Sequence, residues 1–436
     1  MVEMLVKKIY RVFQEEGIYG VFNRTVKQIK KRINPSVHSK TSLTMEDLFL
    51  RMFPEISPPI SSVNSPSSSM RLNLVVDTIN HDVLFGGVAT SLILAVLYAH
   101  RRKIPLRIIS TKRTIDVKVV NEFIALHRLP VVKLEFVSVC FDGLTITRKS
   151  LDVYKQDIFI STSWWSTFEI KSINRNRVVF YLLQEDESMF YAHSDRHILF
   201  EKALLQDQVQ LLVNSKSLFS YLADQKSEKI KGKLAKGIYF EPAFPDFLYS
   251  KSIKKEEGQK KVLFFYARPN HPRNLFYTGV ELLDRALCLG VLDPNKWEIV
   301  FAGCNDVPDF SFSNGLKPKF YGKLGWNDYI NLLKKTDLAV NLMYTPHSSY
   351  PPLEACVCGC IAFTNNYSKK REFIDNKNII FCDLQSDKII DQFSDAIDLV
   401  LNLKKTDDLY HNHSFPTSWE STLTPVFDFM DRYTNG

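Results

Sequence analysis

The sequence predicts an α/β protein with two doubly wound domains, preceded by a basic helical segment and a linker. Three observations support this prediction. The chain has 436 residues, of which 45% are hydrophobic, and this length exceeds what one hydrophobic core usually supports. From Arg71 onward, short apolar runs typical of buried parallel strands alternate with helical patterns. A stretch of mixed charges at residues 251–261 divides this alternation into two halves of ordinary domain size.

Residues 1–33 carry most of the net positive charge. They hold eight Lys or Arg and three Glu, a local charge of +5, whereas the whole chain carries +8. Apolar residues recur among them at nearly helical spacing, interrupted at Gly17 and Gly20, which predicts two short amphipathic helices. Such a segment can lie on an anionic membrane surface. We expect it to do so; packing on the rest of the chain or on a partner is the alternative.

The next two segments are a linker and the first domain. Residues 34–70 are rich in Ser and Pro, which predicts a linker with one short amphipathic island at residues 45–53. The first domain, residues 71–250, opens with a strand, a glycine turn at Gly86-Gly87 and an apolar helix. Its strands are expected at residues 72–76, 106–110, 131–139, 157–161, 178–183 and 210–214, and its first helix at 88–99.

The second domain, residues 251–415, repeats the strand and helix alternation, and residues 418–433 of the final segment 416–436 have a helical pattern. Its strands are expected at residues 262–266, 297–302, 319–321, 338–342, 360–364 and 379–382.

Two arginines follow the first strand of the second domain. Arg268 and Arg273 lie in a turn-forming stretch, Arg-Pro-Asn-His-Pro-Arg, that leads into a helix. Ligands of open α/β sheets bind at the carboxyl ends of strands. Two guanidiniums five positions apart across such a turn can converge on one diphosphate. The alternative is that both arginines form surface ion pairs.

A second polar segment follows a later strand of the same domain. The loop at residues 346–350 leads into a helix that begins at Pro351-Pro352 and ends before Gly359. The start of a helix favours anions, and its free N–H groups would face the cleft. Glu354, in the first turn, can accept hydrogen bonds from a vicinal diol, or it can merely complement the helix dipole. Together the two segments predict a nucleotide-sugar site.

These segments resemble the GT-B glycosyltransferases of family four, and most of all the bacterial rhamnosyltransferases such as the S-layer glycan enzyme WsaF. The resemblance spans residues 71–384 and therefore both halves of the chain. It implies two Rossmann-like domains that face a cleft, with the final helix crossing back to the first domain. The stretches that carry it are 266–274, 322–324 and 346–354 in the second half, and 79–80, 85–90, 164–165, 184 and 213–215 in the first.

The resemblance implies an enzyme that transfers a sugar from a nucleoside diphosphate to a carbohydrate hydroxyl, with retention, in bacterial surface-polysaccharide synthesis. It implies catalytic roles for Arg268 and Arg273, which would grip the diphosphate, and for Glu354, which would hold the ribose hydroxyls. The other residues implied at the nucleotide are Lys323, Leu324 and Tyr350, and those at the donor and phosphate loops are Gly86, Gly87, His347, Ser349, Pro351, Pro352 and Leu353.

One departure from the family bears on the donor sugar. The wider family has a Glu eight positions before the ribose-binding Glu, whereas this chain has Pro346 there. The rhamnosyltransferase branch shares this loss, which suits a deoxy sugar and makes dTDP-rhamnose the expected co-substrate. His347 lies next to this position and would touch the transferred sugar. No further cofactor and no metal are expected to be required.

Candidate acceptor residues follow strands of the first domain. Trp164 and Trp165 could stack on an acceptor sugar, although large aromatic residues more often fill a core. Glu185 and Glu187 could activate the acceptor, or they could be solvated loop residues. The expected partner is a carbohydrate or a lipid-linked saccharide, and no nucleic acid is expected because no basic patch with interleaved aromatics recurs beyond residue 33.

Other classes of function fit less well. An inactive GT-B scaffold or carbohydrate-binding protein is the main alternative, but the retained arginines and Glu354 argue against it. A GT-B phosphorylase would need a cofactor lysine motif that is not recognisable here. Gly86-Gly87 lacks the G-x-G-x-x-G spacing of a dinucleotide-binding dehydrogenase.

Cysteines and apolar runs indicate the compartment. The seven cysteines are scattered, as reduced core thiols are, and the alternation of Cys356, Cys358 and Cys360 is not a usual zinc spacing. The sequence has no apolar run of about twenty residues and no recognisable signal peptide. We expect a cytoplasmic protein, with residues 1–33 attached to the inner face of the plasma membrane near a lipid-linked acceptor.

Overall fold

The computed structural model describes residues 44–56, 60, 62–65, 69–139, 150–171, 173, 177–249, 258–403 and 414–434. The basic segment 1–33 lies outside the described residues, so its helices stay a prediction. The chain forms two compact units, residues 1–54 and 55–436, and each is described by itself. Within the described ranges no helix is both long enough and apolar enough to span a bilayer.

In the first unit, the amphipathic island predicted at residues 45–53 is helix α2 (Met45–Met52). Thr44 caps this helix because its hydroxyl accepts a hydrogen bond from the Asp47 N–H at 3.1 Å. The Asp47 carboxylate in return accepts from the Thr44 N–H at 3.2 Å. This reciprocal capping box satisfies N–H groups that a helix start leaves free.

A seven-stranded parallel sheet forms the core of the first half of the second unit. Its strands β2, β3 and β7 are buried at every residue, which explains why they appear in the sequence as predominantly apolar runs. In spatial order the strands are β4 (Leu134–Ser138), β3 (Leu106–Ser110), β2 (Leu72–Val76), β6 (Ile158–Ser161), β7 (Val179–Leu183), β8 (Val209–Asn214) and β9 (Ile238–Phe240). The helices between them are α3 (Gly86–Arg102), α4 (Val117–Leu126), α5 (Trp164–Lys171), η1 (Glu187–Phe190), α6 (Asp195–Leu204), α7 (Lys216–Gln225) and α8 (Glu228–Leu234), and α9 (Asp246–Tyr249) follows β9.

A six-stranded parallel sheet forms the core of the second half. Helix α10 packs closely on it, because a Cβ added to Gly279 would lie 2.4 Å from the Phe265 ring. In spatial order the strands are β12 (Lys319–Phe320), β11 (Trp297–Ala302), β10 (Lys261–Tyr266), β13 (Leu338–Val340), β14 (Ile361–Asn365) and β15 (Ile379–Cys382). The helices are η2 (Pro272–Asn274), α10 (Phe276–Cys288), α11 (Trp326–Lys335), α12 (Tyr350–Val357), η3 (Lys370–Phe373) and α13 (Ile389–Asn402).

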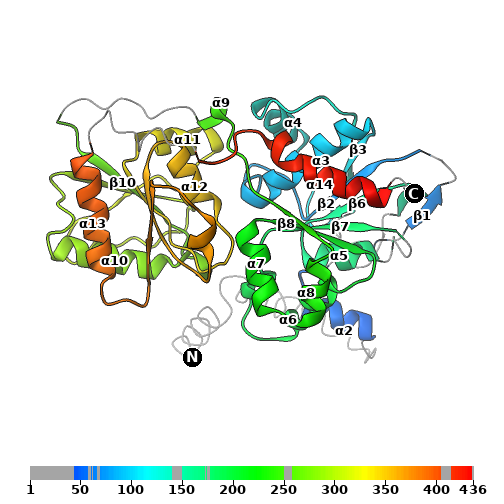
Figure 1. The fold of residues 1–436 in the computed structure, drawn as a ribbon, viewed down its shortest axis with the longest axis horizontal. Helices are drawn as coiled ribbons and strands as arrows, with labels where there is room; N and C mark the ends of the chain where they lie inside the picture. Colours follow the sequence, from blue (N-terminus) through cyan, green and yellow to red (C-terminus); the bar gives the residue numbers. More distant parts are fainter. Residues whose placement is uncertain are drawn as a thin grey trace, which may run out of the picture. The chain divides into compact units, whose positions relative to one another are not determined.

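The last helix, α14 (Trp419–Thr434), packs on the first sheet's half of the unit, where it lies along α3 (Figure 1). Its buried residues, among them Leu423 and Phe427, belong to the same apolar core as β2 and α3. Charged and polar contacts also hold α14 against α3. Arg102 pairs with Asp431 at 2.8 Å, and the Tyr98 hydroxyl donates to Asp431 at 3.0 Å.

Three strands, β1, β5 and β9, were not predicted. Strand β1 (Ser62–Ser65) lies inside the expected linker and pairs in parallel with β5 (Leu151–Tyr154). Its sequence, Ser-Val-Asn-Ser, has no apolar alternation, so the pairing depends on backbone hydrogen bonds to a distant strand. The neighbouring Ile60 is buried, and the Ser/Pro-rich composition gave no indication of either feature.

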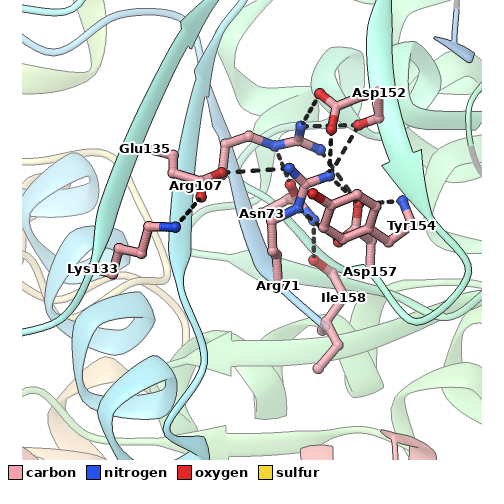
Figure 2. Close-up of polar contacts among 9 residues, drawn as sticks. All are labelled: Arg71, Asn73, Arg107, Lys133, Glu135, Asp152, Tyr154, Asp157 and Ile158. Atoms are coloured by element: carbon pink, nitrogen blue, oxygen red, sulfur yellow. Dashed lines mark hydrogen bonds and ion pairs between the residues drawn. The ribbon is translucent and has the colours of Figure 1, made fainter. Parts of the chain in front are cut away.

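Buried charges close the amino edge of the first sheet (Figure 2). Arg71, just before β2, donates to both carboxylate oxygens of Asp157 at 3.2 and 3.1 Å, and its guanidinium stacks on the Tyr154 ring. Arg107 on β3 pairs with Asp152 at 2.9 Å. Because this network fills the amino ends of the strands, the opposite edge, formed by their carboxyl ends, is the one open to a ligand.

Candidate functional site

A pocket of about 650 Å³ is lined by both halves of the second unit, from loops that follow the strands of both sheets. It brings together most of the residues that the sequence singled out, although they come from segments far apart in the chain. The predicted residues that line it are Gly86, Gly87, Trp165, Glu185, Glu187, Arg268, Arg273, Lys323, Leu324, His347, Ser349, Tyr350, Pro351 and Glu354.

Arg273, on η2, is paired across the pocket rather than exposed. Its Nη1 lies 2.5 Å from Oε2 of Glu185, which follows β7 of the other half. The second carboxylate oxygen of Glu185 accepts a hydrogen bond from the Thr345 hydroxyl, and the Arg273 guanidinium stacks on Phe190 at 4.3 Å. Glu185 is therefore a buried partner of the predicted clamp residue, and not a solvated loop carboxylate.

Arg268 stands on the same wall as Arg273 and is joined by a neutral histidine. Its Nη2 lies 2.6 Å from Nε2 of His271. Burial, together with the charges of Arg268, Arg273 and Lys323, lowers the pKa of His271 to about 4. Three positive side chains thus act on one imidazole, so this wall has the charge to hold a diphosphate.

Glu354, in the first turns of α12, is buried and held by two phenols. Its Oε2 accepts a hydrogen bond from the Tyr329 hydroxyl at 2.9 Å, and its Oε1 accepts one from the Tyr249 hydroxyl at 3.3 Å. Burial raises the pKa of Glu354 to about 7, although both phenols oppose the rise. Two hydrogen bonds leave lone pairs on this carboxylate for a diol.

The start of α12 offers fewer free N–H groups than the sequence suggested. Pro351 and Pro352 have none, and the Ser349 N–H donates to Nδ1 of His347 at 2.9 Å. The arginines therefore supply most of the positive charge. Pro352 and Leu353 are buried and are not among the residues that line the pocket, so their contact with the donor stays a prediction.

His347 presents a hydrogen-bond donor to the pocket. Since its Nδ1 accepts from Ser349, the neutral ring carries its proton on Nε2. That Nε2 is buried and has no partner among the described residues. Burial lowers the pKa of His347 to about 3, and the charges of Lys370 and Arg273 add to the effect, so the ring stays neutral and can donate to a ligand oxygen.

Tyr350 and the glycine turn join the two halves. The Tyr350 hydroxyl hydrogen-bonds to the Thr90 hydroxyl and accepts a hydrogen bond from Asn214 at 2.9 Å.

Gly86 has a φ of +45°. Gly87 lies so close to Gln184 that an added Cβ would be 3.1 Å from the Gln184 Nε2 atom. Gly86 is therefore favoured by its backbone conformation, and Gly87 by the close approach of the Gln184 side chain.

Lys323 also bridges the pocket. Its Nζ pairs with Asp82 of the other half at 3.0 Å. Its N–H, which we expected near the base, donates to the Asn305 side chain at 2.8 Å. Leu324 packs in the same apolar cluster as Trp326 and Tyr329, and these side chains form the apolar part of the second-domain wall.

Of the four residues predicted at the acceptor, one lies in the core and the other three line the pocket. Trp164 is fully buried and absent from the pocket lining, which fits the alternative that it fills the core. Trp165 lines the pocket, and its Nε1 donates to Asp77 at 2.7 Å. Glu187 accepts from the Trp164 N–H at 2.8 Å, and burial raises its pKa to about 8.

The sequence analysis missed four residues that line the pocket, namely Asp77, His271, Trp326 and Tyr329. It also missed Tyr249 and Thr345, whose hydroxyls donate to the pocket carboxylates Glu354 and Glu185. A signal existed for Asp77, because it directly follows the first strand of its domain, where ligands of such sheets bind. For Tyr249, which lies 105 positions from Glu354, no local pattern existed.

The cysteines that alternate before β14 lie in the core. The Cys356 thiol donates to the Asn378 carbonyl and the Cys360 thiol to the Leu333 carbonyl, while burial raises the pKa of Cys358 to about 12. In the part of the chain that the structure describes, no three His, Cys, Asp or Glu residues are grouped as metal ligands.

Comparisons with known proteins agree with this architecture. The family model of the WsaF N-terminal domain matches residues 71–216, and that of the WsaF C-terminal domain matches residues 261–394. The O-antigen biosynthesis protein RfbC of Myxococcus xanthus is 25% identical over 242 residues, which are 55% of this chain and 18% of RfbC. The chain thus corresponds to a small part of that relative's length.

Solved structures share the fold at low sequence identity. An α,α-trehalose-phosphate synthase (UDP-forming) from Burkholderia xenovorans has a TM-score of 0.55 at 8% identity and covers 84% of this chain and 100% of its own. WaaG, a glycosyltransferase involved in lipopolysaccharide biosynthesis, has a TM-score of 0.50 at 13% identity, with coverage of 84% and 100%. The two-domain GT-B fold that the sequence predicted is confirmed.

Proposed function

The chain belongs to the WsaF family of GT-B glycosyltransferases, and on that premise we propose that it transfers a sugar from a nucleoside diphosphate to a carbohydrate hydroxyl. The observation that carries this proposal is the shared pocket, in which Arg268 and Arg273 stand on the same wall as Glu354. Guanidiniums match phosphate oxygens, and a carboxylate with free lone pairs matches a ribose diol.

The proposed chemistry is electrostatic. When the bond between the sugar and the β-phosphate breaks, negative charge grows on the phosphate, and Arg268 and Arg273 would stabilise that charge. Such stabilisation is usually the largest contribution to catalysis of this kind. With three cationic side chains on this wall, we propose that transfer requires neither a metal nor a further cofactor.

The finer assignments are also proposals. Pro346 stands where the wider family has a Glu that binds donor-sugar hydroxyls, which favours a deoxy sugar and dTDP-rhamnose as donor. The buried Nε2 of His347 would donate to a hydroxyl of that sugar. We infer retention of configuration from the family, and the name of RfbC supports a role in surface-polysaccharide synthesis. Residues 1–33 would hold the enzyme at the inner leaflet, near a lipid-linked acceptor.

Nucleotide binding tests the proposal directly. Purified protein is heated with dTDP, UDP, GDP or ADP, since a ligand that binds only the folded state raises the melting temperature. We expect dTDP to give the largest shift. The absence of a shift with every nucleotide would contradict the proposal and favour a scaffold role.

Replacement of one arginine tests the clamp. We expect Arg268→Ala to slow transfer about 10²- to 10³-fold, by analogy with the loss of one oxyanion-hole donor. Arg285→Ala is the matched control, because Arg285 is exposed on α10 and lies outside the pocket. Equal transfer rates for the two variants would exclude Arg268 from the reaction.

A further inference from the structure

We propose that Asp77, together with the indole of Trp165, binds the acceptor sugar and orients the hydroxyl that receives the transferred sugar. This inference rests on the proposed glycosyl transfer and adds a residue that the sequence analysis did not identify. The role is one of binding and orientation, so Asp77 takes up no proton in it.

The position of Asp77 fits this role. It directly follows Val76, the last residue of β2, and therefore stands at the carboxyl end of a central strand. It lines the same pocket as Arg268, Arg273 and Glu354 but comes from the opposite half of the unit. Since the proposed donor groups are on the second-domain wall, an acceptor must approach them from the wall that holds Asp77.

Asp77 is fixed in place before any ligand arrives. Its carbonyl accepts hydrogen bonds from the N–H groups of Lys112 and Arg113 at 2.9 and 3.2 Å. Its carboxylate accepts from Nε1 of Trp165 at 2.7 Å. A carboxylate has about four acceptor positions, so this donor leaves it able to accept from a sugar hydroxyl.

Trp165 supplies an aromatic surface beside this carboxylate. Its ring packs edge-on against the fully buried Trp164 at 5.7 Å and 87°, so the core sets its orientation. Trp165 lines the pocket. An indole offers its face to the apolar C–H surface of a sugar, while the adjacent carboxylate accepts from the hydroxyls on the rim.

The three other carboxylates of this wall have partners elsewhere, and one of them, Asp82, pairs with Lys323 at 3.0 Å. Glu185 has one oxygen on Arg273 and the other on the Thr345 hydroxyl. Glu187 accepts from the Trp164 N–H at 2.8 Å, so its carboxylate is already used to hold the start of α5. Of the first-domain carboxylates that line the pocket after β2 and β7, Asp77 is thus the one suited to an acceptor hydroxyl.

The test measures two reactions separately: transfer of the sugar to an acceptor, and hydrolysis of the donor by water. The protein is given dTDP-rhamnose, first in water alone and then with the lipid fraction of the bacterium that makes it, and both hydrolysis and transfer are measured. In Asp77→Asn the amide oxygen can still accept from Trp165, but the charge is gone. We expect transfer to fall about 10- to 100-fold, as for a lost charged hydrogen bond, while hydrolysis and the dTDP melting shift stay within about twofold.

Two further variants make the result specific. Trp165→Phe keeps a ring but loses the indole N–H, and we expect a smaller loss of transfer. Asp309→Asn is the matched control, since the Asp309 side chain is 83% exposed and outside the pocket. Normal transfer by Asp77→Asn would overturn the inference, as would equal losses of transfer, hydrolysis and dTDP binding, which would show a structural role. A wild-type protein that neither binds dTDP nor transfers would instead overturn the proposed function.

Discussion

The pair formed by Arg273 and Glu185 predicts how much unfolding free energy a mutation removes. The structure also predicts whether that loss grows or shrinks as the pH changes. Arg273→Ala would leave Glu185 without its cation at a site where 11% of the Glu185 side chain is exposed. The hydrogen bond from the Thr345 hydroxyl would remain, but a hydroxyl carries no charge to replace the guanidinium.

The magnitude follows from the burial of the two side chains. Removing one partner of a fully buried ion pair costs about 3–5 kcal/mol. Arg273 is 26% exposed, so part of its field is already screened by water and we expect about 2–3 kcal/mol of lost unfolding free energy at pH 8.

The loss should shrink in acid. Burial already raises the pKa of Glu185, while Arg273 and Thr345 oppose the rise, so removal of Arg273 raises that pKa further. A carboxyl whose pKa is higher in the folded state destabilises the fold when it is ionised. The penalty is therefore complete above the folded-state pKa and decreases as pH falls through that value toward the unfolded one.

Urea unfolding of the wild type, Arg273→Ala, Glu185→Gln and the double variant, at pH 8 and pH 5 without nucleotide, measures these quantities. We expect the double variant to be more stable than Arg273→Ala at pH 8. Arg273→Ala could lose the same unfolding free energy at pH 8 and pH 5, or the double variant could lose the sum of the two single losses. Either result would refute the buried-pair reasoning.

Three other predictions use different parts of the molecule. Because the pKa of Glu354 is about 7 and the ionised form accepts hydrogen bonds better, dTDP affinity measured by calorimetry should fall from pH 8 to pH 6. Glu354→Gln should bind weakly with no such dependence, and a wild-type affinity that is flat with pH would contradict a ribose role. Gly279→Ala should lower the free energy of unfolding by about 1–3 kcal/mol, because the new Cβ would lie 2.4 Å from the Phe265 ring. Gly232→Ala, where an added Cβ meets no atom within 4 Å, is its control in the same urea titration and should lose nothing. Deletion of residues 1–33 should abolish binding to anionic vesicles in a sedimentation assay, and unchanged binding would rule out the membrane role.

Much of the fold could be predicted because buried parallel strands leave a direct trace in the sequence. Residues 72–76, 106–110 and 297–302 are predominantly apolar runs, interrupted at Asn73, Arg107 and Glu298, and the structure has strands with these same bounds. Strand β1 left no such trace, because Ser62–Ser65 is polar and half of it is exposed. Its pairing with β5 arises from backbone hydrogen bonds, which no side-chain pattern encodes.

The sequence by itself determined which residue types stand at strand ends: Arg268 and Arg273 after one strand, Glu354 after another, and a glycine pair opposite them. Chain order alone fixes such positions, since the carboxyl ends of parallel strands share one edge of a sheet. What each side chain contacts depends on the packing of distant segments. Glu185 meets Arg273 across 88 positions because two sheets line one pocket, and Asp77 meets Trp165 across another 88 because β2 and β6 are neighbours in one sheet. No local spacing in the sequence relates either pair.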